Sequence, residues 1–502
     1  MPQSYIERIL RARVYDVASE SPLTLAKGLS RRLGNQVFLK REDLQPVFSF
    51  KLRGAYARMC RLDVRQRALG VLAVSAGNHA QGVALAASRL GLSAVIVMPV
   101  TTPSIKVDAV RRLGAEVVLE GDGFDEASRR AAELQHESGR VFIHPFDDLD
   151  VIAGQGTVGT EIMRQAESPP DAVFVPVGGG GLIAGVAAAI KCLAPETRII
   201  GVEPAGAASF KAALEAGRPV DIGPVSLFAD GVAVRKVGAH PFRVARDLVD
   251  EVVTVGTDQI CAAVGDVFLD TRIVTEPAGA LAVAGMREYV KHGGAGRQLV
   301  AINSGANISF ERMAHVVERA EIGAGHEVLF AATIPERPGS FLEFCRALGN
   351  TAVSEFNYRC SSTRKAHIFV GLRPADGSDG RTALFDRLRQ SGYPIEDLTE
   401  NALARDHLRH MVGGHCPVPA REVLYQFRFP ERPGALRQFL TCLAGRFSIS
   451  LFHYRNHGAD YGRIVVGMQV PPEEMAQWQS FLTTLGYRYW DESQNPAYQL
   501  FL

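Results

Sequence analysis

Short runs rich in Val, Ile and Ala alternate with longer helical patterns between about residues 70 and 310. This alternation is typical of a parallel sheet covered by helices. The runs that predict strands are 70–74, 93–98, 172–177, 198–202 and 298–302. Because ligands bind outside the carboxyl ends of strands in open parallel sheets, we expect the functional residues directly after these runs.

Length and charge narrow the class of protein. A chain of 502 residues is too long for one core, so two or three domains are expected. An apolar fraction of 47% and a charged fraction of 22% indicate packed globular domains. With 55 basic and 54 acidic residues, nothing in the overall charge favours nucleic acid or an anionic membrane. A small neutral or zwitterionic ligand is the better expectation.

The cysteines and the N-terminal segment predict a cytoplasmic enzyme without a metal site. The 7 cysteines form no C-x-x-C pair and have no metal-ligand spacing. The first thirty residues lack the apolar run of a secretory signal. No stretch approaches the roughly 20 apolar residues that a membrane span requires.

The composition of the sequence changes near residue 320. Residues 321–325 are predicted to form a linker, and aromatic residues are more frequent after it. An internal repeat follows, because Pro-Glu-Arg-Pro-Gly occurs at 335–339 and again at 430–434, an offset of 95 residues. Each copy continues into an amphipathic helix, a Tyr-Arg pair and a strand, with the last two at an offset of 96 residues. We therefore predict three domains, at residues 1–320, 326–400 and 420–502.

Lys51 lies among apolar neighbours, between Phe50 and Leu52. Desolvation lowers the pKa of a lysine, and a neutral amine is the form that condenses with an aldehyde cofactor. A lysine near the start of a helix is more often a solvated surface residue, so this segment alone leaves both interpretations open.

A second candidate segment, Ser75-Ala76-Gly77-Asn78-His79, follows the predicted strand 70–74 and precedes an alanine-rich helix. Its side chains and the backbone N–H groups at a helix N-terminus suit a carboxylate and a cofactor oxygen. The alternative is an ordinary helix cap.

The glycine run 178–181 follows the predicted strand 172–177, with Leu182 next. Four glycines allow backbone N–H groups to converge on a phosphate. However, Gly179, Gly181 and Ala184 also satisfy a dinucleotide fingerprint, with Glu203 about 20 residues further on as its acidic partner. The loop alone does not separate a nicotinamide cofactor from pyridoxal phosphate.

A fourth segment, Asn303-Ser304-Gly305-Ala306-Asn307, follows the predicted strand 298–302. A serine hydroxyl here would contact the ring nitrogen of a pyridine cofactor without forcing its protonation, whereas an aspartate would hold that nitrogen charged. In isolation a Ser-Gly turn carries no functional meaning.

Together the four segments resemble the fold-type II pyridoxal-phosphate enzymes, and most closely the biosynthetic threonine dehydratases. The resemblance extends to 14–17, 22–23, 40–43 and 407–414. Serine dehydratases and serine racemases share the lysine, asparagine and glycine segments, while the C-terminal repeat points to the regulated biosynthetic form. The implied fold is α/β, with two parallel-sheet subdomains followed by two α+β ACT-like regulatory subdomains.

The resemblance also implies a role for each candidate residue. Lys51 is the Schiff-base lysine and the base that takes the α-proton, and Phe50 flanks the cofactor ring. Asn78 contacts the ring hydroxyl, and Ser304 faces the ring nitrogen. The phosphate is held by Gly178, Gly179, Gly180, Gly181 and Leu182. The substrate carboxylate is bound by Ser75, Ala76, Gly77, Asn78 and His79.

The implied reaction converts L-threonine to 2-oxobutanoate and ammonia, the first committed step of isoleucine biosynthesis, with L-serine as a further substrate. The racemases that the chain resembles have Ser-Ser-Gly-Asn at the positions of 75–78, whereas this chain has Ala76 in place of the second serine. The resemblance therefore implies that racemisation is minor.

The resemblance further implies a homotetramer, with isoleucine as feedback inhibitor and valine as its antagonist. An effector must bind two conformational states unequally. The candidate effector residues are Glu336, Arg337, Phe341, Asn357, Tyr358 and Arg359 in the first copy, and Glu431, Arg432, Tyr454 and Arg455 in the second. The alternative is that Pro-x-x-Pro-Gly shapes a turn and the tyrosines are core residues.

Two other classes of protein stay open at this point. A nicotinamide-dependent dehydrogenase is built on the glycine loop and Glu203, and a catalytically silent amino-acid sensor needs only the repeat. The co-occurrence of the four segments favours the dehydratase over both.

Overall fold

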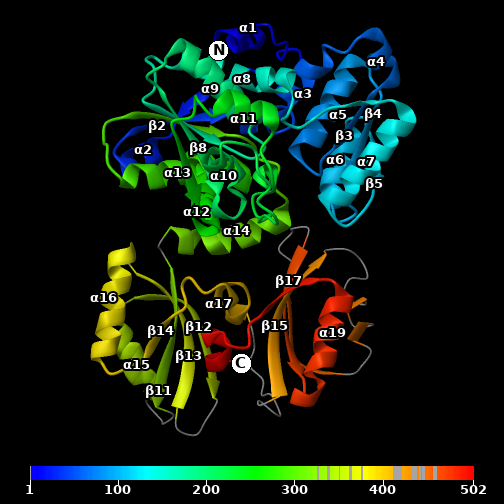
Figure 1. Ribbon diagram of the computed structural model, residues 1–502. Helices are drawn as coiled ribbons and strands as arrows, with labels where there is room; N and C mark the ends of the chain where they lie inside the picture. The colour runs from blue at the N-terminus through cyan, green and yellow to red at the C-terminus, as the bar shows by residue number, and fades with distance from the viewer. Residues whose placement is uncertain are drawn as a thin grey trace. The chain divides into compact units, whose positions relative to one another are not determined.

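The computed structural model describes residues 2–324, 327–335, 340–349, 351–360, 365–374, 377–410, 421–430, 438–439, 442–443, 447–455 and 461–501. The chain divides into two compact units, Met1–Ala320 and Glu321–Leu502. In the first unit a large sheet carries helices on both faces, and a smaller sheet lies beside it (Figure 1).

The large sheet has six strands in the order β1-β2-β10-β7-β8-β9. All neighbours are parallel except β1, which pairs antiparallel with β2. The strands are β1 (Leu23–Leu25), β2 (Gln36–Arg41), β7 (Ala172–Pro176), β8 (Arg198–Pro204), β9 (Glu251–Val255) and β10 (Gln298–Asn303).

The two faces of this sheet alternate along each strand, as the period of two requires. On β7, Ala172 and Phe174 belong to one buried cluster, while Val173 and Val175 belong to the other. The first face is covered by α2 (Lys27–Leu33), α12 (Thr257–Thr271), α13 (Pro277–Lys291) and α14 (Phe310–Gly323). The second is covered by α1 (Pro2–Leu10), α8 (Leu149–Gln165), α9 (Gly181–Leu193), α10 (Ser209–Ala216) and α11 (Ala239–Ala245).

The smaller sheet is entirely parallel, in the order β5-β4-β3-β6. Its strands are β3 (Val71–Val74), β4 (Ala94–Met98), β5 (Glu116–Leu119) and β6 (Val141–Phe142). The helices around it are α3 (Lys51–Met59), α4 (Val64–Leu69), α5 (Asn78–Leu90), α6 (Ser104–Arg112) and α7 (Phe124–Ser138). Each of the five predicted strand runs overlaps one of the strands of these two sheets, and β8 and β10 extend one or two residues beyond their runs, so the predicted parallel architecture is confirmed.

A buried network of charges fixes α3 to its surroundings. Arg53, two residues after Lys51, pairs with Glu42 at 2.8 Å and with Glu161 of α8 at 2.6 Å. Lys40 of β2 pairs with the same Glu161 at 2.7 Å, and all four side chains are fully buried. Removing one partner of such a network leaves a buried charge unpaired, which lowers the free energy of unfolding by about 3–5 kcal/mol. The network therefore sets the position of the helix that begins at Lys51.

The second unit contains two four-stranded sheets, ordered β12-β13-β11-β14 and β16-β17-β15-β18. The first comprises β11 (Val328–Pro335), β12 (Ala352–Cys360), β13 (Lys365–Arg373) and β14 (Ile395–Asp397), with α15 (Ser340–Leu348) and α16 (Gly377–Gln390). The second comprises β15 (Glu422–Pro430), β16 (Ser448–Arg455), β17 (Tyr461–Gln469) and β18 (Arg488–Asp491), with α19 (Met475–Leu485). Shorter helices are α17 (Ala402–Asp406) and α20 (Pro496–Phe501).

The two sheets correspond strand for strand, down to an irregularity in pairing. The register shifts between Val353 and Glu355 in β12, and between Ile449 and Leu451 in β16, at the offset of 96 residues seen in the sequence. All pairings in both sheets are antiparallel. Two α+β copies of one module account for the repeat.

The candidate effector residues fall partly on the regulatory strands. Asn357, Tyr358 and Arg359 lie in β12, where they pair with 369, 368 and 367 of β13. Tyr454 and Arg455 lie in β16, and Phe341 lies in α15. Glu336, Arg337, Glu431 and Arg432 lie outside the described residues. Among the described helices, none is long and apolar enough to cross a membrane.

Candidate active site

Lys51 lies in the first turn of α3, and its Nζ donates a hydrogen bond to the carbonyl oxygen of Pro145 at 3.1 Å. Its Nζ lies 5.3 Å from the centroid of the Phe50 ring. Burial lowers the pKa of the Lys51 amine to about 8, although the nearby Glu276 acts in the opposite direction. The amine is thus accessible in its neutral form near physiological pH. Lys51 is not the solvated surface lysine of the alternative interpretation.

Backbone pairing brings the segment before Lys51 against the loop that follows β10. The N–H of Phe50 donates to the Ser304 carbonyl at 3.3 Å, and the N–H of Ala306 donates to the Phe48 carbonyl at 2.9 Å. Phe48 adopts a φ of 55°, which is uncommon for a residue with a side chain. Ser304 is buried, and its Oγ donates to the Ala278 carbonyl at 3.2 Å. The pairing therefore holds Lys51 and Ser304 at one site.

Asn78 is the first residue of α5, but it is not the helix cap, which is Gly77. Its Nδ2 donates to Oε1 of Glu276 at 2.6 Å, and its Oδ1 accepts from Nδ2 of Asn307 at 2.6 Å. The amide of Asn78 therefore faces the Ser304 loop rather than its own helix. The alternative of an ordinary cap is wrong for this residue.

Glu276 is a site residue that sequence reasoning missed. It caps α13 just before Pro277 and is buried. Burial and the nearby Asp230 raise the pKa of its carboxyl to about 7, against the opposing effects of the Asn78 hydrogen bond and of Lys106 and Arg312. A carboxyl that titrates near neutrality, facing the candidate lysine, is typical of a functional site.

A cluster of charges adjoins Glu276 and joins the two sheets of the first unit. Lys106, from α6 beside the small sheet, pairs with Asp230 at 2.8 Å. Arg312 of α14 lies 3.5 Å from the same carboxylate. Burial raises the pKa of Asp230, but the two cations outweigh it, so the net shift is well below the usual range. Asp230 therefore remains ionised beside Glu276.

The glycine run adopts a conformation that its neighbours impose. A Cβ on Gly179 would overlap the Phe146 ring, and a Cβ on Gly178 would come within 2.8 Å of the Val232 backbone. Gly180 has a φ of 89° and directly precedes α9. Backbone without side chains at the start of a 13-residue helix is suited to a phosphate. The next residue after the run, Leu182, is buried in the core.

Glu203 does not serve the glycine loop. Its two carboxylate oxygens accept hydrogen bonds from the N–H groups of Phe210 at 2.8 Å and Lys211 at 2.9 Å. The side chain therefore binds the first turn of α10, where it is buried. Because its acidic partner is already engaged, the dinucleotide interpretation of the glycine loop is wrong.

The loop after β3 has open space beside its glycine, whereas the glycine run is surrounded by protein atoms. A Cβ on Gly77 would meet no atom within 4 Å. Ser75 and Ala76 are partly exposed, and the Ser75 Oγ accepts from the Gly77 N–H at 3.2 Å. His79 is buried, with its Nε2 2.7 Å from the Ile143 carbonyl, and burial lowers the pKa of its imidazole to about 3. His79 therefore offers a ligand its backbone N–H but no charge.

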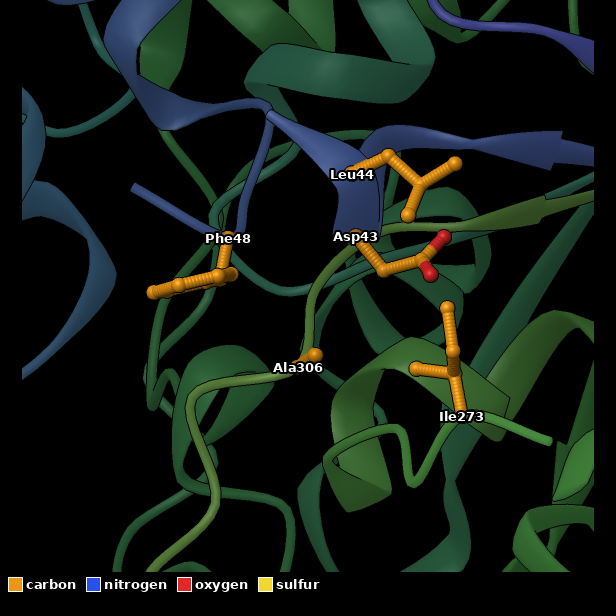
Figure 2. A pocket seen from close by; sticks show the side chains of 5 residues that line it. All are labelled: Asp43, Leu44, Phe48, Ile273 and Ala306. Carbon is orange, nitrogen blue, oxygen red and sulfur yellow. The ribbon is translucent and has the colours of Figure 1, made fainter. Parts of the chain in front are cut away.

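A pocket of about 350 Å³ opens beside the pairing of the Phe48 and Ala306 segments. Figure 2 shows its lining of Asp43, Leu44, Phe48, Ile273 and Ala306. Asp43 forms an ion pair with Arg41 at 2.6 Å, so its charge is already compensated. Neither the lysine nor the glycine run lines this pocket, although Phe48 and Ala306 belong to the pairing that adjoins Lys51.

Comparisons with known proteins agree with this geometry. The family of pyridoxal-phosphate dependent enzymes matches residues 14–305, and the C-terminal regulatory domain of threonine dehydratase matches 318–408 and 415–502. The biosynthetic L-threonine dehydratase of Burkholderia multivorans is 52% identical over 505 residues, 99% of each chain. The chain belongs to the biosynthetic threonine dehydratases. The enzyme of Escherichia coli with that name is 50% identical, covering 99% of this chain and 97% of its own.

Similar solved structures extend the likeness to three dimensions. The processed form of threonine deaminase isoform 2 from Solanum lycopersicum is 53% identical with a TM-score of 0.62, over 64% of this chain and 93% of that one. Maize serine racemase is 32% identical with a TM-score of 0.58, over 62% and 95%. The predicted family, fold class and cofactor of a threonine dehydratase are confirmed.

The residues of the site fit pyridoxal phosphate. A desolvated amine is available for the aldehyde, and the backbone of the glycine run at the start of α9 is available for the phosphate. The structure brings Lys51, Phe50, Asn78 and Ser304 together through the pairing of the Ser304 loop. Besides Glu276, sequence reasoning missed the role of Asn307, although that residue stands in the segment 303–307 that was singled out.

Proposed function

We propose that this chain is a threonine ammonia-lyase that converts L-threonine to 2-oxobutanoate and ammonia, and that also acts on L-serine. The observation that carries the proposal is the desolvated Lys51 amine, which donates to the Pro145 carbonyl and directly follows the segment that pairs with the Ser304 loop. Identity of about half over the full length of biosynthetic threonine dehydratases supports the choice of substrate.

Bound pyridoxal phosphate supplies the electron withdrawal that acidifies the α-carbon of the substrate. In the proposed reaction, the Lys51 amine carries the cofactor between turnovers and then takes the α-proton as a general base. The backbone N–H groups of 178–181, with the dipole of α9 behind them, hold the phosphate. Asn78 would donate to the ring hydroxyl, Phe50 would flank the ring, and Ser304 would face the ring nitrogen.

The open loop is the proposed site for the substrate carboxylate. The space beside Gly77 and the N-terminus of the 13-residue helix α5 favour an anion there. Ser75 adds a hydroxyl, and 76–79 add backbone N–H groups. Because the His79 ring is neutral and bonded to Ile143, the positive potential comes from the helix rather than from a side chain.

The second unit is proposed to bind the effectors, with isoleucine as inhibitor and valine as its antagonist. Its match to the regulatory domain of threonine dehydratase supports feedback control. The two copies of the module provide corresponding strand positions, of which Tyr358 in β12 and Tyr454 in β16 are one pair. We further propose that the enzyme is a cytoplasmic homotetramer.

A 2-oxo acid assay tests the catalytic proposal. The purified protein should form 2-oxobutanoate from L-threonine and pyruvate from L-serine, and Lys51→Ala should lose about 10²- to 10⁴-fold in kcat. Lys27→Ala is the matched control, since Lys27 also begins a helix but is exposed. Borohydride reduction should attach the cofactor at residue 51, as mass spectrometry would detect. A protein that binds pyridoxal phosphate yet releases no 2-oxo acid would contradict the proposal.

Truncation tests the regulatory proposal. A chain that ends after Gly323, the last residue of α14, should remain active and lose its response to isoleucine. The full-length protein is the reference. Inhibition that persists in the truncated enzyme would assign the effector site to the first unit instead.

A further inference from the structure

We propose that Asn307 and Glu276 are positioning residues that hold the Asn78 amide in a single orientation, so that one of its N–H groups is aimed at the cofactor. The inference deepens the proposed role of Asn78 and rests on the proposed function. Asn307 and Glu276 act through Asn78.

The orientation is set from one fixed end. A backbone carbonyl can only accept a hydrogen bond, and Nδ2 of Asn307 lies 2.9 Å from the carbonyl oxygen of Val47. The same Nδ2 lies 2.6 Å from Oδ1 of Asn78. Since a side-chain NH₂ group has two hydrogens, both are used, and the Asn307 amide cannot reverse without losing two bonds.

The constraint passes from Asn307 to Asn78. Because the Asn78 Oδ1 faces a donor, its Nδ2 must be the end that meets the Glu276 Oε1 at 2.6 Å. Reversing the Asn78 amide would set NH₂ against NH₂ at Asn307 and oxygen against oxygen at Glu276. One hydrogen of the Asn78 Nδ2 remains, and it is this hydrogen that the arrangement directs.

The surroundings of Glu276 keep it in place as the acceptor at the far end. It is buried at 3% exposure, and its own N–H donates to the Gly305 carbonyl at 3.2 Å. The charged groups near the carboxyl are Asp230, Lys106, Arg312 and Lys51. The relay thus runs from Val47 to Asn307, Asn78 and Glu276, between segments that are far apart in the chain.

A double-mutant cycle on cofactor affinity tests the relay. Apoenzyme is titrated with pyridoxal phosphate, and the Kd is measured from the visible absorbance of the complex. Asn307→Ala should weaken binding about tenfold when Asn78 is present, the value of one well-placed hydrogen bond. In the Asn78→Ala background it should weaken binding less than about threefold, because the residue through which it acts is gone.

The matched control is Asn35→Ala. The Asn35 amide also makes two hydrogen bonds, to the Leu33 carbonyl and from the Arg297 N–H, but it has no part in the relay. Its substitution should leave the Kd unchanged, even if the melting temperature of the apoenzyme falls. Equal losses from Asn307→Ala with and without Asn78 would overturn the relay, since they would show that Asn307 acts on the fold alone.

The conservative variant at the other end separates an acceptor from a general structural role. Glu276→Gln retains an oxygen for the Asn78 N–H and should keep the Kd within about threefold of the wild type. Glu276→Ala should weaken binding about tenfold. If the two variants are equally impaired, Glu276 is not the acceptor of the relay. Activity on L-threonine is not the readout, so loss of the relay and loss of the proposed reaction remain distinguishable.

Discussion

Two loops of the active site have the same plan and opposite surroundings. Each follows a parallel strand, contains glycine and leads into a helix of 13 residues. In the loop at 178–181, a Cβ would collide with atoms of Phe146, Val232 or Pro241. At Gly77, a Cβ would meet nothing within 4 Å. The first loop is filled by the protein itself, and the second leaves room for a ligand.

This difference separates two uses of glycine. In the filled loop the glycines are required by packing, so the N–H groups that would hold the phosphate have a fixed position. In the open loop a Cβ on Gly77 would meet no protein atom, so packing does not require a glycine at this position. The same residue type is therefore enclosed by packing in one loop and open in the other, where we propose that the substrate carboxylate binds.

The largest effect is expected from filling the packed loop. Gly179→Ala forces a methyl group into the Phe146 ring, and overpacking of this kind costs about 1–3 kcal/mol or more. We expect the purified variant to melt at a lower temperature and to lose most of its pyridoxal phosphate, measured by absorbance after denaturation. Gly265→Ala is the control, because a Cβ there meets nothing.

The second substitution sharpens the first. Adding Phe146→Ala to Gly179→Ala removes the ring that the methyl group meets, so cofactor binding should partly return. If Gly179→Ala alone binds pyridoxal phosphate as the wild type does, the view that packing fixes this loop is wrong.

The next effect concerns Glu276, which holds the first residue of the helix beyond the open loop. The pKa of its carboxyl is about 7 in the folded protein, against an ordinary value of 4.5. The folded state therefore holds the proton more tightly. This stabilisation is fully present below pH 4.5 and is lost as the pH rises through 7, by about 3 kcal/mol.

Glu276→Gln removes this titration. The melting temperature of the variant apoenzyme, relative to wild type, should rise as the pH increases from 5 to 8. Lys51, Lys106, Asp230 and Arg312 face the same carboxyl and are unchanged in the variant, so the difference isolates Glu276. A difference that stays constant across this range would contradict the raised pKa.

A smaller effect on stability, but a specific one on substrate, is expected from filling the open loop. Gly77→Ala adds a methyl group to empty space, so its melting temperature and cofactor content should match the wild type. The KM for L-threonine should rise about tenfold, the value of one lost carboxylate contact. A variant that fails to fold would remove the contrast between the two loops.

The sequence predicts the plan of these loops but not their surroundings. The strands before them are predictable because apolar runs of strand length alternate with helical periods, and the functional residues follow because strand ends meet at one edge of a sheet. Which glycine is crowded depends on Phe146, a residue that no local pattern connects to 178–181. Glu203 makes the same point, because its spacing fits a fingerprint while its oxygens cap α10.

The partners of Asn78 are the clearest case of what a pattern cannot give. Asn78 contacts Glu276 across 198 residues of sequence and Asn307 across 229. Glu276 precedes Pro277 at a helix start, and Asn307 ends the segment 303–307 that follows a predicted strand. They become neighbours only in the fold, where β10 pairs with β2 and the loop after β10 pairs with the segment before Lys51.

The smallest expected effect tests the chemistry of the open loop rather than its space. Ala76 occupies the position at which the similar serine racemases have a second serine. The hydroxyl of that serine returns a proton on the face opposite the lysine. Ala76→Ser adds such a donor next to Gly77, in a partly exposed position. We expect weak D-serine formation from L-serine, while elimination remains the main reaction. Chiral chromatography of the recovered serine measures it, and the absence of D-serine would mean that the open loop does not place residue 76 on that face.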